Sequence, residues 1–187
     1  MNESMMQAVL MQHAIAKRYQ LTAPNLAMLY AWEADLISAT NAWLVHEYEI
    51  KVSRSDFLAD SNKRAKHASL AREFASSPGP RKPRDEVMQS LLDQGWLDLD
   101  LSRKTPNYFW YATNGFEIDP SEIPHYAGWL RIKWHERFGR YGVRVEKQAP
   151  RLHSEKLSER KRLNLARWLS YKLSNMYNLR YLKEQAQ

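Results

Sequence analysis

The sequence contains no cysteine among its 187 residues. This absence excludes a disulfide framework and every metal site that uses thiolate ligands. No run of about 18 apolar residues occurs, so we expect no membrane-spanning helix. The opening residues, MNESMMQAVLMQ, place Glu3 where a signal peptide carries basic side chains. We therefore expect a cytoplasmic protein with no membrane partner.

Acidic residues are scarce in the last part of the chain. Residues 151–187 contain nine Lys or Arg and three Glu, a net charge of +6, whereas residues 1–150 carry a net charge of +1. A basic tail on a near-neutral body suits a polyanion, nucleic acid first, although a solvated helix face would have the same composition. The tail residues that we expect to contact nucleic acid are Arg160, Lys161, Arg162 and Arg167.

The composition, 44% hydrophobic and 12% aromatic, is sufficient for a packed core. Apolar periodicity predicts a helix over 3–19, strands over 34–40 and 43–52 joined at 40–42, and a helix that begins at Ser55 and breaks near Asn62. Residues 24–32 fit a short helix or the entry to the first strand. The remaining predicted elements are a loop over 76–84, a helix over 85–94, strands over 107–112 and 127–134, and a basic helix from 154 to about 183. The fold class is mixed α/β.

Three charged residues, Glu47, Glu49 and Lys51, alternate with apolar residues in the strand EYEIKV. Side chains alternate across a strand, so the three charges share one face and lie roughly 7 Å apart. Ordinary Glu–Lys pairs on an exposed strand produce the same pattern. If the hairpin turns at residues 40–42, however, Asp35 lies opposite Glu47 and diagonal to Glu49, on this same face.

In that register, Asp35 and Glu49 form a hard oxygen site suited to Mg²⁺ or Mn²⁺. Such an ion lowers the pKa of a bound water and neutralises phosphate oxygens. Lys51 beside it would stabilise the negative charge that develops on a phosphate under attack. The combination is what hydrolysis of a phosphodiester bond requires.

The pattern of Asp35, thirteen intervening residues and then Glu49-Ile50-Lys51, set in a hairpin between helices, resembles the PD-(D/E)XK nuclease superfamily. The runs EADLISAT and EYEIKVSRSDFLAD, with PNYFWYATNGFEIDPSEIPHYAGWLRI, are similar to the small MmcB-like DNA-repair and phage proteins of that superfamily. The likeness covers about residues 33–133. It implies a restriction-endonuclease-like core, a mixed sheet flanked by helices, over 1–145. A basic helical extension, 146–187, would follow it.

The resemblance also implies roles for single residues. Asp35, Glu49 and the backbone carbonyl of Ile50 would hold Mg²⁺ or Mn²⁺, and Lys51 would be the motif lysine. Alanine replaces the motif proline before Asp35, and the additional glutamate that superfamily members often take from the first helix has no clear counterpart. The candidates for that additional ligand are Glu3, Glu33 and Glu47.

Basic residues after the motif are candidates for contact with nucleic acid. Arg54 could touch a phosphate, while Ser55 and Asp56 are expected to cap the next helix. Lys63 and Lys66 fit two arrangements equally well, one facing the site and one on an ordinary amphipathic face. His46 falls on the opposite face of its strand, so we interpret it as structural.

The sequence therefore predicts a metal-dependent deoxyribonuclease in DNA repair or phage DNA processing. DNA is expected rather than RNA. The first alternative is a catalytically silent nucleic-acid-binding module on the same fold. A glycoside hydrolase that uses Glu47 and Glu49 is a weaker alternative, because their spacing is a little above the retaining separation and at the bottom of the inverting one, and because the chain is basic. The apolar stripe of the predicted C-terminal helix fits packing on its own domain and packing on a second copy equally well.

Overall fold

The computed structural model describes residues 1–27, 29–30, 32–76 and 105–185. The chain forms two compact units, Met1–Lys156 and Leu157–Gln187; the sequence placed the boundary at 145/146. The predicted helix over 85–94 and nearly all of the predicted loop over 76–84 lie outside the described residues. Within the described part of the chain, no helix is both long and apolar enough to cross a membrane.

The first unit is built on one six-stranded sheet whose strands follow chain order, β1 to β6. The strands are β1 (Leu21–Leu26), β2 (Ala34–Ala39), β3 (Val45–Lys51), β4 (Tyr108–Thr113), β5 (Ala127–His135) and β6 (Arg140–Lys147). Strands β3, β4 and β5 run parallel, and the other neighbouring pairs are antiparallel. This architecture confirms the predicted mixed α/β class. The nuclease-like identity of the core stays a prediction.

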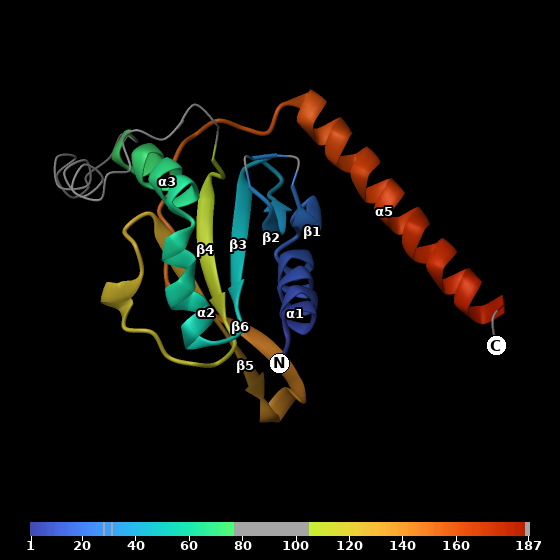
Figure 1. The fold of residues 1–187 in the computed structure, drawn as a ribbon, viewed down its shortest axis with the longest axis horizontal. Coiled ribbons are helices and arrows are strands. Elements are labelled where there is room, and N and C mark those ends of the chain that lie inside the picture. The colour runs from blue at the N-terminus through green and yellow to red at the C-terminus, as the bar shows by residue number, and fades with distance from the viewer. Residues whose placement is uncertain (28, 31, 77–104, 186–187) are drawn as a thin grey trace. The chain divides into compact units, whose positions relative to one another are not determined.

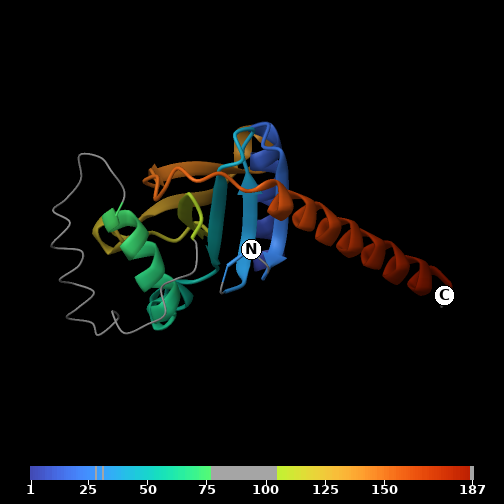
Figure 2. The same ribbon diagram turned by 90° about the horizontal axis from the view of Figure 1, so that it is seen from above.

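Helices cover both faces of the sheet (Figures 1 and 2). Helix α1 (Glu3–Ala16) packs on one face, where Met6 and Leu10 join Leu36, Tyr48 and Ile50 in a buried cluster. Helices α2 (Arg54–Ala59) and α3 (Arg64–Ser76) cover the other face, and the 3-10 turn η1 (Asp60–Asn62) separates them. Large buried side chains of that second core include Phe57, Leu70, Phe74, Phe109, Tyr111 and Trp129. The predicted break near Asn62 is confirmed.

Two strands differ from the sequence prediction. β1 occupies Leu21–Leu26, where only a helix or a strand entry over 24–32 was expected; Pro24 and a left-handed Asn25 (φ 51°) gave this edge strand the composition of a turn. β6 was not predicted at all. Its alternating Tyr141, Val143 and Val145 were a strand signal, but Arg and Gly between them obscured it.

The helix after β3 begins two residues earlier than expected. Ser53, not Ser55, is its N-cap: Ser53 has an extended backbone, and its hydroxyl accepts a hydrogen bond from the Asp56 amide. The predicted capping role of Asp56 is confirmed, because its carboxylate accepts from the Val52 amide at 3.1 Å. This double cap fixes the direction in which the chain leaves the end of β3, and so the position of α2 beside it.

The second unit consists mainly of α5 (Glu159–Gln185). Ser158 caps it, since its hydroxyl lies 3.4 Å from the Lys161 amide and its carbonyl accepts from the Arg162 amide. Many large apolar side chains of α5 are exposed, among them Leu163, Tyr171, Leu173, Met176, Tyr177 and Leu179. A helical tail was predicted, and the apolar stripe expected along it is exposed at Leu173, Met176 and Tyr177.

Candidate active site

The register of β2 on β3 decides which charges meet. Leu36 pairs with Tyr48 and Ile37 with Glu47, so the ladder continues to bring Asp35 opposite Glu49. The prediction that Asp35 lies opposite Glu47 is wrong by two residues. The connection is longer than expected: the Thr40 amide bonds the Leu44 carbonyl at 2.9 Å, closing a wider loop. A shift of two positions keeps every side chain on its predicted face, so Asp35, Glu49 and Lys51 still converge.

Asp35 lies at the end of β2 against the backbone of Ile50. Its Oδ2 accepts a hydrogen bond from the Ile50 amide at 2.7 Å. The structure thus brings together the aspartate and the Ile50 backbone; the proposed role of the Ile50 carbonyl as a ligand stays a prediction. Burial, together with the negative charge of Glu49, raises the pKa of Asp35 to about 7. Two carboxylates facing each other at this point repel unless a proton or a cation lies with them.

Helix α1 contacts the same point through Gln7, a residue that the sequence did not single out. The Gln7 amide donates to the Asp35 carbonyl at 3.0 Å and to Glu3 Oε1 at 3.2 Å. The negative charge of Glu3 is close enough to contribute to the raised pKa of Asp35. Glu3, a candidate for the additional metal ligand, therefore lies beside the site, although its side chain is exposed.

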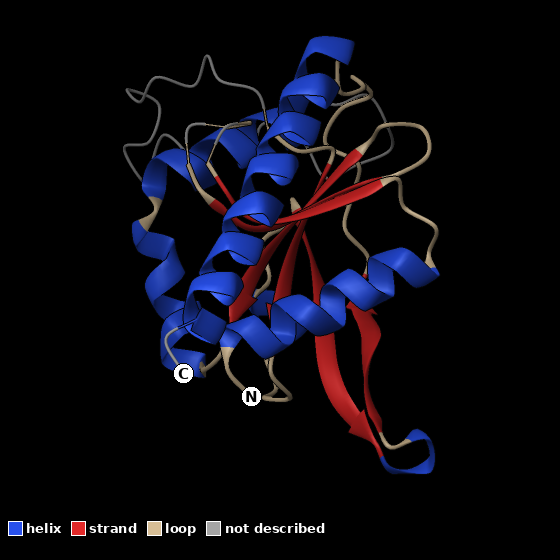
Figure 3. Cartoon of the chain, turned by 90° about the vertical axis from the view of Figure 1, so that its right-hand side faces the viewer, coloured by secondary structure: helices blue, strands red, loops and turns tan. Residues whose placement is uncertain are grey.

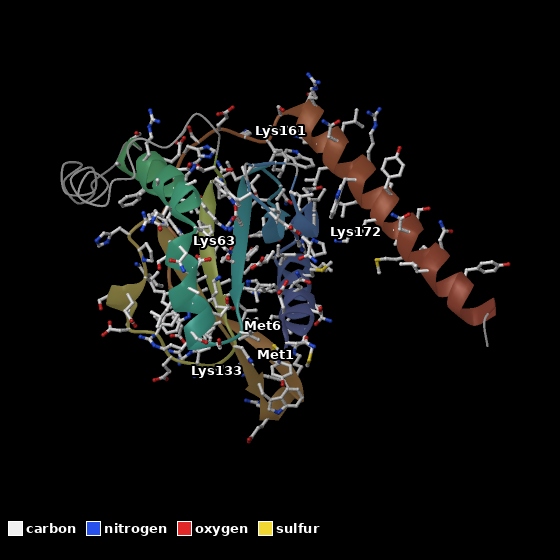
Figure 4. All side chains as sticks on the ribbon, in the orientation of Figure 1. Met1, Met6, Lys63, Lys133, Lys161 and Lys172 are labelled. Carbon is white, nitrogen blue, oxygen red and sulfur yellow. The ribbon has the colours of Figure 1, made fainter. Side chains whose placement is uncertain are left out.

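Glu49 is buried and surrounded by ammonium groups. Its Oε1 accepts from Lys51 Nζ at 2.9 Å and also from Lys63, while its Oε2 accepts from Lys66 Nζ at 2.6 Å. Burial acts to raise the pKa of Glu49, but the charges of Lys66 and Lys51 outweigh it and hold that pKa below its usual value. Lys63 and Lys66 thus face the site, which resolves the two arrangements left open by the sequence; Lys63 lies where α3 begins (Figure 4).

Asp60 is the central residue that sequence reasoning missed. Its Oδ1 accepts from Lys51 Nζ at 2.8 Å, and its Oδ2 accepts from the Tyr111 hydroxyl at 2.8 Å and lies 3.0 Å from His67 Nε2. Burial alone would raise the pKa of Asp60, yet the hydrogen bond with His67 and the nearby Lys51 ammonium hold it far below its usual value. Asp60 therefore stays ionised and fixes the position of Lys51.

Glu47 is completely buried behind Glu49. Its Oε1 accepts from Lys66 Nζ at 2.6 Å and from the Trp32 indole at 2.9 Å. Its Oε2 is buried and has no hydrogen-bond partner among the described residues. Burial, only partly offset by Lys66, raises the pKa of Glu47. Glu33, by contrast, is exposed and does not join this group.

We call the assembled group the carboxylate–lysine cluster. Its members are Asp35, Glu47, Glu49, Asp60, Lys51, Lys63 and Lys66, four carboxylates and three ammonium groups with a net charge of −1 when all are ionised. Lys63, whose side chain is 49% exposed, and the half-buried Asp35 are its accessible members. Access from solvent therefore leads first to the Asp35–Glu49 pair.

Arg54 is not part of the cluster, and the predicted tail cations belong to the other unit. Arg54 forms an ion pair with Glu122 at 2.5 Å, and both side chains are partly exposed. Arg160, Lys161, Arg162 and Arg167 belong to α5 in the second unit. Arg162 there donates to the Leu157 carbonyl at 2.7 Å. His46, interpreted as structural, is buried and accepts from the Trp110 indole at 3.0 Å.

Comparison with known proteins adds little beyond the fold. No protein-family model matches the chain, and no curated protein does. A solved structure, the SPO1766 protein of unknown function from Silicibacter pomeroyi, is similar with a TM-score of 0.51 and 16% identity. The match covers 92% of this chain and 86% of that one. At such identity the likeness supports the fold alone.

Proposed function

We propose that this protein is a metal-dependent nuclease that hydrolyses phosphodiester bonds in DNA. The observation that carries the proposal is the convergence of Asp35, Glu49 and Lys51 at the end of β3. Asp35 faces Glu49 across the β2–β3 pair, and Lys51 lies within 2.9 Å of Glu49. DNA repair and phage DNA processing are the settings that the sequence resemblance suggests.

The chemistry of the donors fits a hard divalent cation. The Asp35–Glu49 pair offers oxygen ligands at the accessible side of the cluster, and because burial and the charge of Glu49 raise the pKa of Asp35, a cation bound there would relieve the repulsion. The buried Glu47 Oε2 has no partner among the described residues, which is consistent with a site completed by an ion or water. Fewer than three His, Asp or Glu side chains come together in metal-binding geometry within the described ranges.

The ion would be held by Asp35 and Glu49, where it would supply an activated water and neutralise phosphate oxygens. Lys51 would place its ammonium group beside the phosphate and stabilise charge as it develops. Asp60 holds Lys51 at 2.8 Å and keeps it protonated, because its carboxylate, with that of Glu49, raises the pKa of Lys51 despite burial. Lys51 would therefore act as a cation and not as a general base.

One observation favours the alternative of a silent nucleic-acid-binding module. Both oxygens of Glu49 accept hydrogen bonds from lysines. Lys63, however, is half-exposed; it pairs with Glu49 and lies 3.1 Å from Asp60 Oδ1, so a cation could replace its ammonium group from the solvent side. Exchange of the Lys63 ammonium group for a metal ion would convert the lysine-bound state of Glu49 into a metal-bound one.

The test is a cleavage assay with plasmid, linear duplex DNA, single-stranded DNA and RNA, each with Mg²⁺ or Mn²⁺. Wild type is compared with Asp35→Asn, Lys51→Ala and the matched control Glu33→Gln, which changes an exposed carboxylate two residues from Asp35. We expect cleavage by wild type and Glu33→Gln, and none with EDTA or with the two site variants. Thermal melting confirms that each variant is folded. Binding of DNA without cleavage on any substrate would instead establish the silent module.

A further inference from the structure

Strand β5 and strand β6 continue beyond the end of the rest of the sheet. Lys51, Thr113 and Arg131 lie in one row across β3, β4 and β5, and β3 ends at this row. β5 continues for four more residues to His135, paired throughout with β6. At about 3.3 Å per residue, the hairpin extends about 13 Å past the row that contains Lys51. Figure 3 shows it standing out from the body; we call residues 132–145 the arm.

The arm is basic and its charges are little compensated. It contains Lys133, Arg137, Arg140 and Arg144 against one acid, Glu136, a net charge of +3. Arg144 lies 3.4 Å from Glu146, whereas within the described residues no carboxylate lies within salt-bridge distance of the other three cations. Lys133 and Arg144 alternate onto the face of Arg131, which is the face on which Lys51 lies (Figure 4 labels Lys133). The sheet face that carries the cluster thus continues into a cationic surface.

Exposed aromatic side chains lie near these cations, with Trp134 on the opposite face of the hairpin from Lys133 and Arg144 and with Phe138 beside Arg137 and Arg140. Trp134 is 52% exposed and packs edge-on against Tyr141 with ring centroids 5.0 Å apart. Phe138, at the tip, is 62% exposed, and the guanidinium groups of Arg137 and Arg140 lie 5.7 and 5.8 Å from its ring. More than half of each side chain is exposed, and core packing does not account for the exposed part, so the exposure requires another explanation.

We propose that the arm is a nucleic-acid-binding element that grips the phosphate backbone with its cations and stacks unpaired bases on Trp134 and Phe138. Cations alternating with exposed aromatic rings suit single-stranded nucleic acid, whose bases offer free faces for stacking. The arm extends past the row that contains Lys51, so a strand bound at the cluster would lie next to it. This inference rests on the proposed function, and it specifies the substrate class as DNA with a single-stranded segment or an open end.

Binding by the full-length chain is measured by fluorescence anisotropy in EDTA, so that cleavage plays no part. The probes are a 20-nucleotide mixed-sequence single strand and the corresponding blunt duplex. Trp134→Ala and Phe138→Ala remove the stacking rings; Ile15→Ala, an exposed apolar residue on α1, is the control. We expect each ring variant to bind the single strand about 5- to 150-fold more weakly, the range measured for loss of one stacked base. Binding to the duplex should change less than about twofold.

The phosphate contacts are tested by salt dependence. In the double variant Arg137→Gln/Arg140→Gln, the slope of log affinity against log salt on the single strand should become less steep by about 1.4, or 0.7 for each lost contact. The double variant Lys17→Gln/Arg72→Gln, which removes two exposed cations outside the arm, should retain the wild-type slope.

Several results would overturn the inference. An unchanged slope would exclude the phosphate contacts. Equal effects of Trp134→Ala on single strand and duplex, or no effect on either, would exclude stacking. A wild-type dimer in sedimentation that Trp134→Ala converts to a monomer, with DNA binding intact, would assign the arm to contact between copies. If the protein does not cleave DNA but its binding still depends on the arm, only the proposed nuclease activity is refuted. If it cleaves DNA and its binding does not depend on the arm, only this inference is refuted.

Discussion

Asp35→Asn should make the protein more stable above pH 7 while removing its proposed activity. The asparagine oxygen can still accept the 2.7 Å hydrogen bond from the Ile50 amide, so the substitution removes the charge and little else. The pKa of Asp35 is about 7 in the folded chain, against a usual value of 3.8. Taken in full, this difference corresponds to about 4 kcal/mol. Because Asp35 is only half-buried, solvent screens part of it, and we expect a gain of about 1–2 kcal/mol.

The sign of the pH dependence follows from proton binding. A carboxyl whose pKa is raised by folding binds more protons in the folded state, so the contribution of Asp35 to wild-type stability falls as pH rises from about 4 to about 7 and is then constant. The gain from Asp35→Asn should therefore be near zero at pH 4, grow up to pH 7 and remain constant above it. At pH 8 it should raise the melting temperature by roughly 2–8 °C. The control Glu33→Gln should show no such growth.

Added metal extends the same experiment. Mg²⁺ or Mn²⁺ at about 100 times its dissociation constant should stabilise the wild type by about 2.7 kcal/mol, and Asp35→Asn should lose most of that effect. The measurement is differential scanning fluorimetry from pH 4 to pH 8, with and without metal. A lower melting temperature for Asp35→Asn at pH 8, or a gain equal at pH 4 and pH 8, would refute the repulsive carboxylate pair.

The remaining predictions concern the lysines and a buried histidine. Lys66→Met should cost about 3–5 kcal/mol in chemical denaturation, because it leaves buried Glu47 and Glu49 without their shared ammonium group. Lys63→Ala should lower the free energy of unfolding by less than about 1 kcal/mol, since Lys63 is half-exposed. Calorimetry should show unchanged or tighter Mg²⁺ binding by this variant. Much weaker binding would contradict the role of Lys63 as the replaceable group. Burial lowers the pKa of His46 to about 4, so the contribution of His46 to stability should fall as pH drops from about 6.5 to 4, and His46→Gln should remove that contribution to the pH dependence.

The face on which the charges meet was predictable, whereas the partner of Asp35 was not. Period-two alternation places Glu47, Glu49 and Lys51 together whatever the loop length, and Asp35 shares their face provided that the register shifts by an even number. The loop itself depends on Trp43 in a left-handed conformation, φ 60°, which bulky residues seldom adopt. The sequence contains no pattern that predicts this conformation, so the predicted register of β2 on β3 was wrong by two residues.

Asp60 shows a second limit of the sequence. Asp60 lies nine residues after Lys51, beyond the six-residue helix α2, and the local sequence SDFLAD contains no pattern that identifies Asp60 as a site residue. It reaches Lys51 only because α2 ends there and η1 turns the chain back over the sheet. Its other partner, Tyr111, comes from β4, on the far side of a long connection. Contacts of this kind follow from tertiary packing, which local patterns do not encode.

The cost of the carboxylate–lysine cluster bears on the choice between enzyme and silent module. Removing five charged groups, Glu47, Glu49, Lys51, Asp60 and Lys66, from water is expensive, and apolar residues of similar volume would usually make such a core equally or more stable. Binding to a phosphate backbone requires exposed cations, which the arm and α5 already provide. Such binding does not require Glu49 and Asp60, which are only 1% and 2% exposed, or the buried Glu47 oxygen that has no hydrogen-bond partner among the described residues. Buried carboxylates that hold a lysine in place are what hydrolysis at a phosphate uses, and this favours the enzyme.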